Sequence, residues 1–490
     1  MSDTGSRLLR NALYLFVGVI IANIGSFIFR ILIAQKYGSS GFGLLSIGLM
    51  ITSIATTISL LGLSDGMINF IPRNRTNENY GQLLGTIITG FSISLGIAII
   101  LTFSLVITSP IISNRVFGIE ELTNILIWMS LIVPANILIR LSSAVALGFE
   151  RGGYRVFIKQ SFPRITLLVF TSIAIIIDLT ITDIGRIYAL SMWIAAVVGI
   201  GLLIKIIPTR KVKTLTANPQ RLVSFSLPLM FASTAGLFLN WIDTAIVGIY
   251  LTESKVGIYQ SAFLIANNIG IFLGAIAGSL YPNFSTLLEN NSSDQIRERY
   301  TQGRRWGFLV SIAPITYLLF FPEQSLRFIF GSEFGQGDNS LQIILFGQFI
   351  YILTGPISNL LKSLERSRFI FMTYIVGGVS NLILNLSFVP RYGILGAAVG
   401  TSTATIIVHG SHYWKVNQEI KIGIFDFNLI RAGGAAVTAA MPSLVAALYV
   451  NSHFQFIMHI LFFSILYIVG LYLLGGIDKQ DLKQIYQAMI

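Results

Sequence analysis

Residues 11–34, NALYLFVGVIIANIGSFIFRILIA, form an apolar run in which Arg30 is the single charged side chain. A helix needs about 20 apolar residues to cross the hydrocarbon core of a bilayer. In lipid its backbone hydrogen bonds are satisfied internally. The run is also too long for the apolar part of a secretory signal peptide. It therefore predicts a retained transmembrane helix.

Thirteen further runs of the same kind follow, separated by short polar loops. The predicted spans lie near 11–34, 43–66, 82–108, 122–147, 165–182, 187–207, 224–250, 257–281, 306–326, 341–361, 369–389, 393–414, 429–450 and 455–475. Composition agrees, because 54% of the 490 residues are hydrophobic and 11% are charged, whereas soluble domains carry about 25% charged residues. The predicted fold is an all-α integral membrane protein with about fourteen transmembrane helices. The chain has no cysteine, which excludes a thiol nucleophile and a thiolate metal site.

The basic residues predict the orientation of these helices. Of the 33 Lys and Arg residues, 25 fall in alternate loops and six in the loops between them, while Arg30 and Arg140 lie inside spans. An excess of basic residues marks cytoplasmic loops. Both termini are therefore predicted to lie in the cytoplasm, with the protein in the cell (cytoplasmic) membrane. Basic juxtamembrane loops meet anionic headgroups, which accounts for the net charge of +12, and no nucleic-acid partner is expected.

Short sequences that recur at a nearly constant offset predict an internal duplication. The pairs are Phe42-Gly43-Leu44 with Val256-Gly257-Ile258, Asn69-Phe70 with Asn283-Phe284, and Glu150-Arg151 with Glu365-Arg366. The offset in numbering is 214 for the first two pairs and 215 for the third. Six spans per copy enter the membrane in the same direction, so two six-helix bundles related by an axis along the membrane normal are expected. The predicted domains are the two bundles at 1–207 and 224–415, a cytoplasmic linker at 208–223, and a C-terminal pair of extra helices with a cytoplasmic tail at 416–490.

Four motifs carry a resemblance to a known family. They are RLLRNALY at 7–14, IAQKYGSSGFGL at 33–44, LGLSDG at 61–66 and YGILGAAVG at 392–400. With them, the chain resembles the polysaccharide biosynthesis (oligosaccharide flippase) family of the multidrug/oligosaccharidyl-lipid/polysaccharide exporter superfamily. The resemblance implies flipping of a lipid-linked sugar, on a polyprenyl phosphate or pyrophosphate, to the outer leaflet by alternating access. It also implies that the first span lines a central cavity and that the extra helix pair flanks a lipid-facing groove.

Charged residues inside spans are the first candidates for the substrate site, because a charge costs about 2.5–3.5 kcal/mol to insert at a helix centre. Arg30 lies four residues from the outer end of span one, where a planar guanidinium suits phosphate recognition; snorkelling to the interface is the alternative. Arg140 lies near the cytoplasmic end of its span, and snorkelling explains it more simply. Asp65, at the inner end of span two, is a candidate turn or headgroup-level residue.

Asp243 lies about eight residues below the outer end of span seven, too deep for a carboxylate to snorkel. Adding 214 to Arg30 gives position 244, so Arg30 and Asp243 are expected at similar depth, facing one another across the cavity. The neutral candidates for sugar binding are Asn240, Gln260 and Asn267. For each of these, hydrogen bonding between packed helices is the alternative function.

Three function classes are compatible with this pattern. A flippase for a lipid-linked oligosaccharide comes first, with the lipid-linked sugar and membrane lipids as partners, and glycan-assembly enzymes as further candidates. A cation-coupled multidrug exporter of the same superfamily is the alternative. A membrane glycosyltransferase or polymerase is less favoured, because the longest outward loop, near 327–340, is short. A transporter, not an enzyme, is expected, without cofactor or metal; H⁺, Na⁺ or the membrane potential remain open as driving forces.

Overall fold

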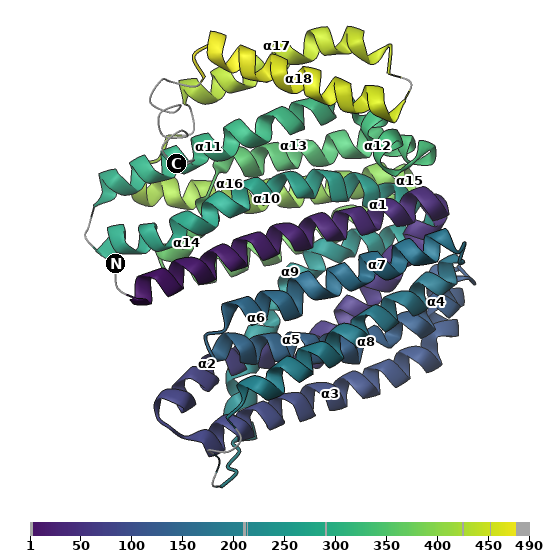
Figure 1. Ribbon diagram of the computed structural model, residues 1–490. Coiled ribbons are helices and arrows are strands. Elements are labelled where there is room, and N and C mark those ends of the chain that lie inside the picture. Colours follow the sequence, from purple (N-terminus) through teal and green to yellow (C-terminus); the bar gives the residue numbers. More distant parts are fainter. Residues whose placement is uncertain are drawn as a thin grey trace. The chain divides into compact units, whose positions relative to one another are not determined.

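The computed structural model describes residues 3–208, 212, 214–289, 292–423, 426–450 and 452–476, and within these ranges the protein is helical and contains no strand (Figure 1). Contacts divide the chain into two compact units, Met1–Gly257 and Ile258–Ile490. We refer to them as the first and the second unit. The prediction of an all-α protein is confirmed.

Among its described residues, the first unit holds nine complete α-helices and two short π-helices. They are α1 (Asp3–Leu60), α2 (Leu63–Thr76), α3 (Tyr80–Ile111), η1 (Ile112–Phe117), α4 (Leu122–Ser130), α5 (Ile132–Gly148), α6 (Gly152–Val156), η2 (Phe157–Ser161), α7 (Phe162–Ile176), α8 (Ile181–Ile206) and α9 (Pro219–Tyr250). Helix α9 contacts α1, α2 and α3. Helix α9 therefore packs with the first unit, although it begins the second copy of the predicted repeat. The division of the chain into two six-helix bundles stays a prediction.

The second unit begins within α10 and contains the remaining helices. They are α10 (Glu253–Glu289), α11 (Ser293–Phe320), α12 (Pro322–Phe330), the 3₁₀-helix η4 (Ser332–Gly337), α13 (Asp338–Thr354), α14 (Ile357–Ser363), α15 (Ser367–Tyr392), α16 (Ile394–Ile420), α17 (Phe427–Ala447) and α18 (His453–Leu473). Helices α17 and α18 run side by side (Figure 1), and both contact α11.

Many of these helices are long and apolar enough to cross a membrane. Within the described ranges nine qualify, or up to eleven if each of two bent pairs is one span. The bent pairs are α11 with α12, at 94°, and η4–α13 with α14, at 47°. The protein is therefore a multi-pass membrane protein, while the predicted number of about fourteen spans stays a prediction.

Helix α1 contains the first two predicted spans in one element. It is broken at Gly38, whose φ of 68° and ψ of −169° are not helical. Since φ in this region favours glycine, Gly38 separates the run at 11–34 from the run at 43–66. The second run was predicted to reach residue 66, but α1 ends at Leu60, before Leu61 and Gly62 at φ 48° and 71°. A side chain on Gly62 would collide with the carbonyl oxygen of Ser226 on α9.

Turns recur at the offset that the sequence repeat predicts. Glu150 and Glu365, which the repeat pairs, both have positive φ, at 62° and 59°. Arg151 donates its amide N–H to Ala146 at 2.8 Å, and Arg366 donates to Leu361 at 3.0 Å. In both copies a positive-φ residue reverses the chain at a helix C-terminus, as in a Schellman-type ending. Asp178 at φ 59° and Gly393 at φ 61° are a second pair of turns at the same offset.

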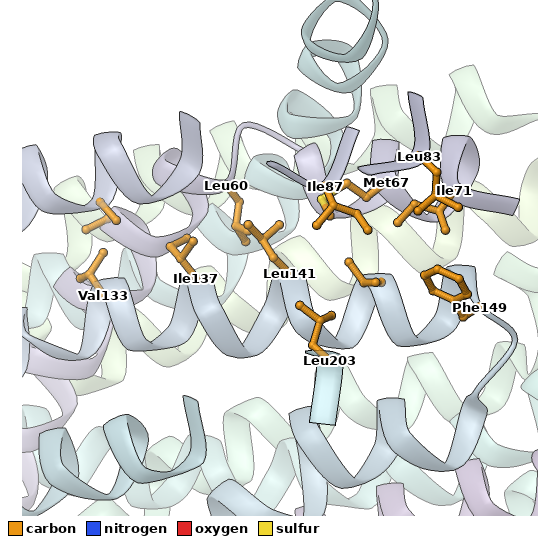
Figure 2. Close-up of a cluster of buried hydrophobic side chains, with 13 residues drawn as sticks. Leu60, Met67, Ile71, Leu83, Ile87, Val133, Ile137, Leu141, Phe149 and Leu203 are labelled. Atoms are coloured by element: carbon orange, nitrogen blue, oxygen red, sulfur yellow. The ribbon is translucent and has the colours of Figure 1, made fainter. Parts of the chain in front are cut away.

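Each unit has its own apolar core. In the first unit, Val133, Ile137 and Leu141 of α5, with Phe149 directly after it, face Met67 and Ile71 of α2 and Leu83 and Ile87 of α3 (Figure 2). Leu60 and Leu203 join from α1 and α8. The spacing of the α5 residues places them on one face of the helix, so α5 is the central packing helix of this cluster.

The glycines of the YGILGAAVG motif at 392–400 allow α16 to approach α15 closely. A Cβ on Gly396 would lie 2.5 Å from the carbonyl carbon of Phe388, and one on Gly400 would lie 2.6 Å from Oδ1 of Asn381. Asn381 and Asn385 are buried there, and Asn385 Nδ2 donates to the Asn381 carbonyl oxygen at 2.9 Å. This motif therefore serves helix packing in the second unit, as small residues do in membrane proteins.

The C-terminal helix pair is fastened to α11 by a histidine. His459 of α18 is hydrogen-bonded through Nδ1 to the Tyr317 hydroxyl at 2.9 Å and through Nε2 to the Ser443 carbonyl oxygen at 2.9 Å. Since a carbonyl only accepts, Nε2 carries the proton and the tyrosine donates to Nδ1. The bridge joins α18, α17 and α11, so this histidine has a packing role.

Candidate functional site

Arg30 lies on α1 where this helix packs against α7. A Cβ on Gly25, five residues earlier, would lie 3.4 Å from Cβ of Arg164. The charge of Arg164 acts on Arg30, and Tyr188 of α8 is a second electrostatic neighbour. The ring of Tyr188 also packs edge-on against Phe29, with centroids 5.6 Å apart. Arg30 is half-buried, and its electrostatic neighbours belong to α7 and α8.

Arg140 of α5 belongs to the same electrostatic group. Arg164 acts on it as well, and Arg140 in turn acts on Lys159 of η2. Lys159 is exposed, and partial loss of hydration against the protein lowers the pKa of its ammonium, with a further lowering by the charges of Arg140 and Arg155. We call Arg30, Arg140, Lys159 and Arg164 the cationic group. These cations come from four elements of the first unit.

Asp65 is an acidic neighbour of this group. It lies in the first turn of α2 and is exposed. Its carboxylate interacts electrostatically with both Arg140 and Lys159 and favours their charged forms. Like charges that act on one another disfavour their charged forms. An anion with several oxygens would relieve that repulsion and accept hydrogen bonds from the guanidinium groups. The cationic group is therefore a candidate site for an anionic ligand.

Asp243 is buried on α9, with 1% of its surface exposed, and Thr244 beside it is fully buried. The predicted burial of this carboxylate is thus present in the structure. Asp243 belongs to the same unit as Arg30, but its coupling to Arg30 stays a prediction. As a buried carboxylate in a membrane helix, it remains a candidate for a functional role.

The three neutral candidates differ in exposure. Gln260 of α10 is buried, with 3% of its surface exposed, whereas Asn240 of α9 and Asn267 of α10 are exposed. Exposed amides in membrane-spanning helices need a polar cavity or a headgroup as a partner. The assignment of all three to sugar binding stays a prediction.

Two members of the cationic group were not predicted from the sequence. Both are among the 25 basic residues of the predicted cytoplasmic loops, and in the structure Lys159 lies on η2 and Arg164 in the first turn of α7. The signal in the sequence was the spacing of Arg155, Lys159 and Arg164, four and five residues apart. This spacing places side chains on neighbouring turns of a helix. The π-helical widening at η2 is a feature that often marks functional sites.

The structure thus defines a multi-pass helical membrane protein with a cationic group in its first unit. The sequence profile of the polysaccharide biosynthesis protein family matches residues 8–288, more than half of the chain. The chain belongs to this family of the multidrug/oligosaccharidyl-lipid/polysaccharide exporter superfamily. A second profile of the superfamily, MatE, matches residues 228–387.

Similar proteins agree with this assignment. A probable low-salt glycan biosynthesis flippase, Agl15 of Haloferax volcanii, is 27% identical over 252 residues, which are 51% of this chain and 53% of that protein. The chain thus spans about half the length of this relative. An uncharacterized membrane protein of Methanocaldococcus jannaschii, MJ1068, is 22% identical over 95% of both chains. The lipid II flippase MurJ, in an inward closed conformation, superposes with a TM-score of 0.74 and 15% identity, over 94% of this chain and 98% of that one. This last likeness concerns the fold.

Proposed function

We propose that the protein is a flippase that moves a lipid-linked oligosaccharide across the cytoplasmic membrane by alternating access, for polysaccharide or glycoconjugate biosynthesis. The cationic group carries this proposal, because it gathers Arg30, Arg140, Lys159 and Arg164 in one unit and leaves Asp65 as an acidic neighbour. Arginine binds phosphate oxygens in a bidentate manner. The head group is therefore a sugar on a polyprenyl phosphate or pyrophosphate, whose phosphate lies on the cationic group.

The family and its relatives support the same conclusion. The matching family is described by polysaccharide biosynthesis, and the names of Agl15 and MurJ state flippase activities for those proteins. The proposal transfers this activity to the present chain, as a membrane transporter and not an enzyme. The driving force that we propose is a gradient of H⁺ or Na⁺ or the membrane potential.

A multidrug exporter is the second candidate, and the match of the MatE profile to residues 228–387 favours it. The cationic group opposes it for cationic drugs, since a cluster of arginines repels a cation. The two candidates separate in reconstituted vesicles. A flippase moves a fluorescent polyprenyl diphosphate-linked monosaccharide from the inner to the outer leaflet, measured by dithionite quenching. Movement of ethidium without movement of the lipid probe would reject the flippase.

We further propose fourteen spans with both termini in the cytoplasm, as the distribution of basic residues predicts. Thr216 is a convenient probe of this orientation. It is exposed in the segment between α8 and α9, and its amide N–H donates to the Gly81 carbonyl oxygen of α3 at 3.4 Å. Thr216→Cys in this cysteine-free chain should be labelled by an impermeant maleimide only after the cells are opened. Labelling in intact cells would contradict the proposed orientation.

A further inference from the structure

A small cleft opens between α2, α3 and α9, which contact one another within the first unit. Its polar lining residues are Asn74 of α2, Gln82 and Thr86 of α3, and Asn218 and Arg221 at the start of α9. The lining thus contains one cation and no carboxylate. We call it the α2–α3–α9 cleft. It is separate from the cationic group, none of whose members lines it.

The segment before α9 lies directly on the backbone of α3, and this contact shapes the cleft. A Cβ on Gly81 would collide with the Thr214 carbonyl oxygen, and one on Gly85 would collide with the Thr216 carbonyl oxygen. Only glycine allows so close an approach of two backbones. Helix α9 therefore starts beside the first turns of α3, which brings polar residues from the starts of both helices into one cleft.

Arg221 is exposed, and its guanidinium lies over the ring of Phe70, with Cζ 5.3 Å from the ring centroid. Among the described residues this guanidinium donates no hydrogen bond and pairs with no carboxylate. Oδ1 of Asn218 accepts from the Arg221 amide at 3.0 Å, so the Asn218 side chain turns N–H groups outward as donors. Gln82 adds a second carboxamide. A guanidinium with neutral N–H donors is suited to phosphate oxygens.

The size of the cleft limits what can enter it. It encloses about 20 Å³, and one water needs about 10–15 Å³. A phosphate group can therefore place one or two oxygens inside, with its ester at the open mouth. A sugar ring is too large. The α2–α3–α9 cleft thus suits a phosphate and not a glycan.

An exposed apolar surface continues from the cleft along α9. Arg221, Phe225 and Leu229 are spaced by four residues, so they lie on one face of the helix. Phe225 and Leu229 are 38% and 36% exposed, and the Phe225 ring packs edge-on against Phe70 with centroids 5.2 Å apart. A cation followed along one helix face by exposed apolar side chains matches the order of groups in a lipid, in which the phosphate is followed by acyl chains.

We propose that the α2–α3–α9 cleft binds the phosphate of an anionic membrane lipid, whose acyl chain follows Phe225 and Leu229. In the proposed orientation the cleft faces the cytoplasmic leaflet, whose anionic lipids attract basic residues. A choline headgroup would add a second cation beside Arg221, so an anionic glycerol headgroup binds better. The lining joins α2 and α3 of the first copy to α9, which begins the second. The bound lipid therefore tethers the start of α9 to the first unit. This binding does not depend on the transport activity.

Titration of phosphatidylglycerol into the delipidated protein in detergent, followed by native mass spectrometry, measures this site. Arg221→Gln should weaken binding of the first lipid about tenfold, as expected for loss of a charge-assisted hydrogen bond. The control is Arg73→Gln, which removes an exposed charge from the last turn of α2 outside the cleft. It should change binding less than about twofold. Equal losses in the two variants would overturn the site, because any basic residue would then suffice.

A second pair of variants changes the cleft without changing its charge. Thr86→Leu fills the cleft, and Gln82→Leu removes an amide donor at a partly exposed position. Each should weaken phosphatidylglycerol several-fold, and thermal unfolding without lipid identifies the variants that remain folded. Wild-type binding by a folded variant would place the lipid elsewhere and overturn the proposal.

The source of the phosphate is tested with three further measurements. Phosphatidylcholine should bind more weakly than phosphatidylglycerol, and equal binding would overturn the anionic headgroup. Inorganic phosphate should not displace phosphatidylglycerol at matched ionic strength; displacement would indicate a site for free phosphate and overturn the lipid. Leu229→Gln should weaken phosphatidylglycerol about threefold through loss of apolar contact, and unchanged binding would overturn the path of the acyl chain.

Discussion

The two copies of the repeat share their turns but differ in their charges. Glu150 and Glu365 adopt the same left-handed φ, 62° and 59°, at the ends of α5 and α14. Yet at the offsets of the repeat, Arg30 of the first copy corresponds to Thr244, Lys159 to Tyr374 and Arg164 to Val379 of the second. The copies therefore have similar backbones around interiors of different chemistry.

This difference teaches which features a duplicated membrane protein retains. Turns and glycine contacts are set by packing, which both copies need, and the backbone hydrogen bonds that they close are costly to lose in lipid. A cationic group is costly unless a ligand uses it. One phosphate group needs one such site, and the cationic group lies in the first copy, whereas the buried charges of the second copy are Asp243 and Arg304.

The largest effect on flipping is expected from removing arginines of the cationic group, which distinguishes the first copy from the second. Arg164→Ala should reduce flipping of the polyprenyl diphosphate-linked monosaccharide at least tenfold, and Arg30→Ala likewise, with normal expression. Hydrogen bonds to charged groups contribute about 1.5–3 kcal/mol, and about 1.4 kcal/mol is a factor of ten. Arg30→Lys should retain part of the activity, since lysine keeps the charge but lacks the bidentate geometry. The assay is dithionite quenching in vesicles.

The control for charge removal lies in the second copy. Arg366 is half-exposed and pairs with Glu419 at 3.0 Å, and Arg366→Ala should change flipping less than twofold. Equal losses for Arg164→Ala and Arg366→Ala would mean that the two copies share the site. Normal flipping by Arg30→Ala would leave Arg30 as an interfacial anchor.

Long apolar runs were predictable from the sequence, whereas the cationic group was only half predictable. The runs at 11–34 and 43–66 follow from hydropathy, and the repeat predicts the correspondence of Glu150 with Glu365. Arg30 and Arg140 were found because they interrupt apolar runs. Lys159 and Arg164 were missed because hydropathy cannot distinguish a basic loop from a basic helical turn. Their placement depends on how α1, α5 and α7 pack.

Coupling between Arg30 and Asp243 is expected to be the next largest effect. Asp243 is buried, and a buried carboxylate is stable beside a cation or a hydrogen-bond donor. In a double-mutant cycle, Arg30→Gln and Asp243→Asn should deviate from additivity by about 1 kcal/mol in flipping or thermal stability. Additive effects would leave Asp243 as a separate site and remove the proposed link between corresponding positions of the two copies.

Relief of backbone strain at the paired turns, Glu150 and Glu365, should have a smaller effect than the double-mutant coupling. It should change stability in the same direction at both turns. A left-handed conformation costs a residue with a β-carbon about 1–2 kcal/mol, while glycine adds entropy to the unfolded chain. Glu150→Gly and Glu365→Gly should each stabilise the protein by about 0.5–1 kcal/mol, measured by thermal unfolding in detergent. Glu150 also lies 3.7 Å from Arg75, so its gain should be slightly less. The alanine variants keep the β-carbon and should show no gain; stabilisation by alanine would contradict the strain.

The smallest effect is expected at the other pair of turns, Asp178 and Gly393, because the two copies differ there by one exposed ion pair. Lys36 hydrogen-bonds to Asp178, and this bond and its charge hold the pKa of the Asp178 carboxyl below its ordinary value of 3.8. A lowered pKa means that the folded protein favours the carboxylate, so the contribution to stability is present above the ordinary pKa and is lost as the pH falls through the lowered one. Asp178→Asn should therefore lower Tm slightly at pH 7, and the gap to the wild type should close on acidification below pH 3.8. High salt should also narrow it, since exposed pairs are screened. A gap that widens on acidification, or one that Lys36→Gln does not reproduce, would show that the ion pair does not stabilise this turn.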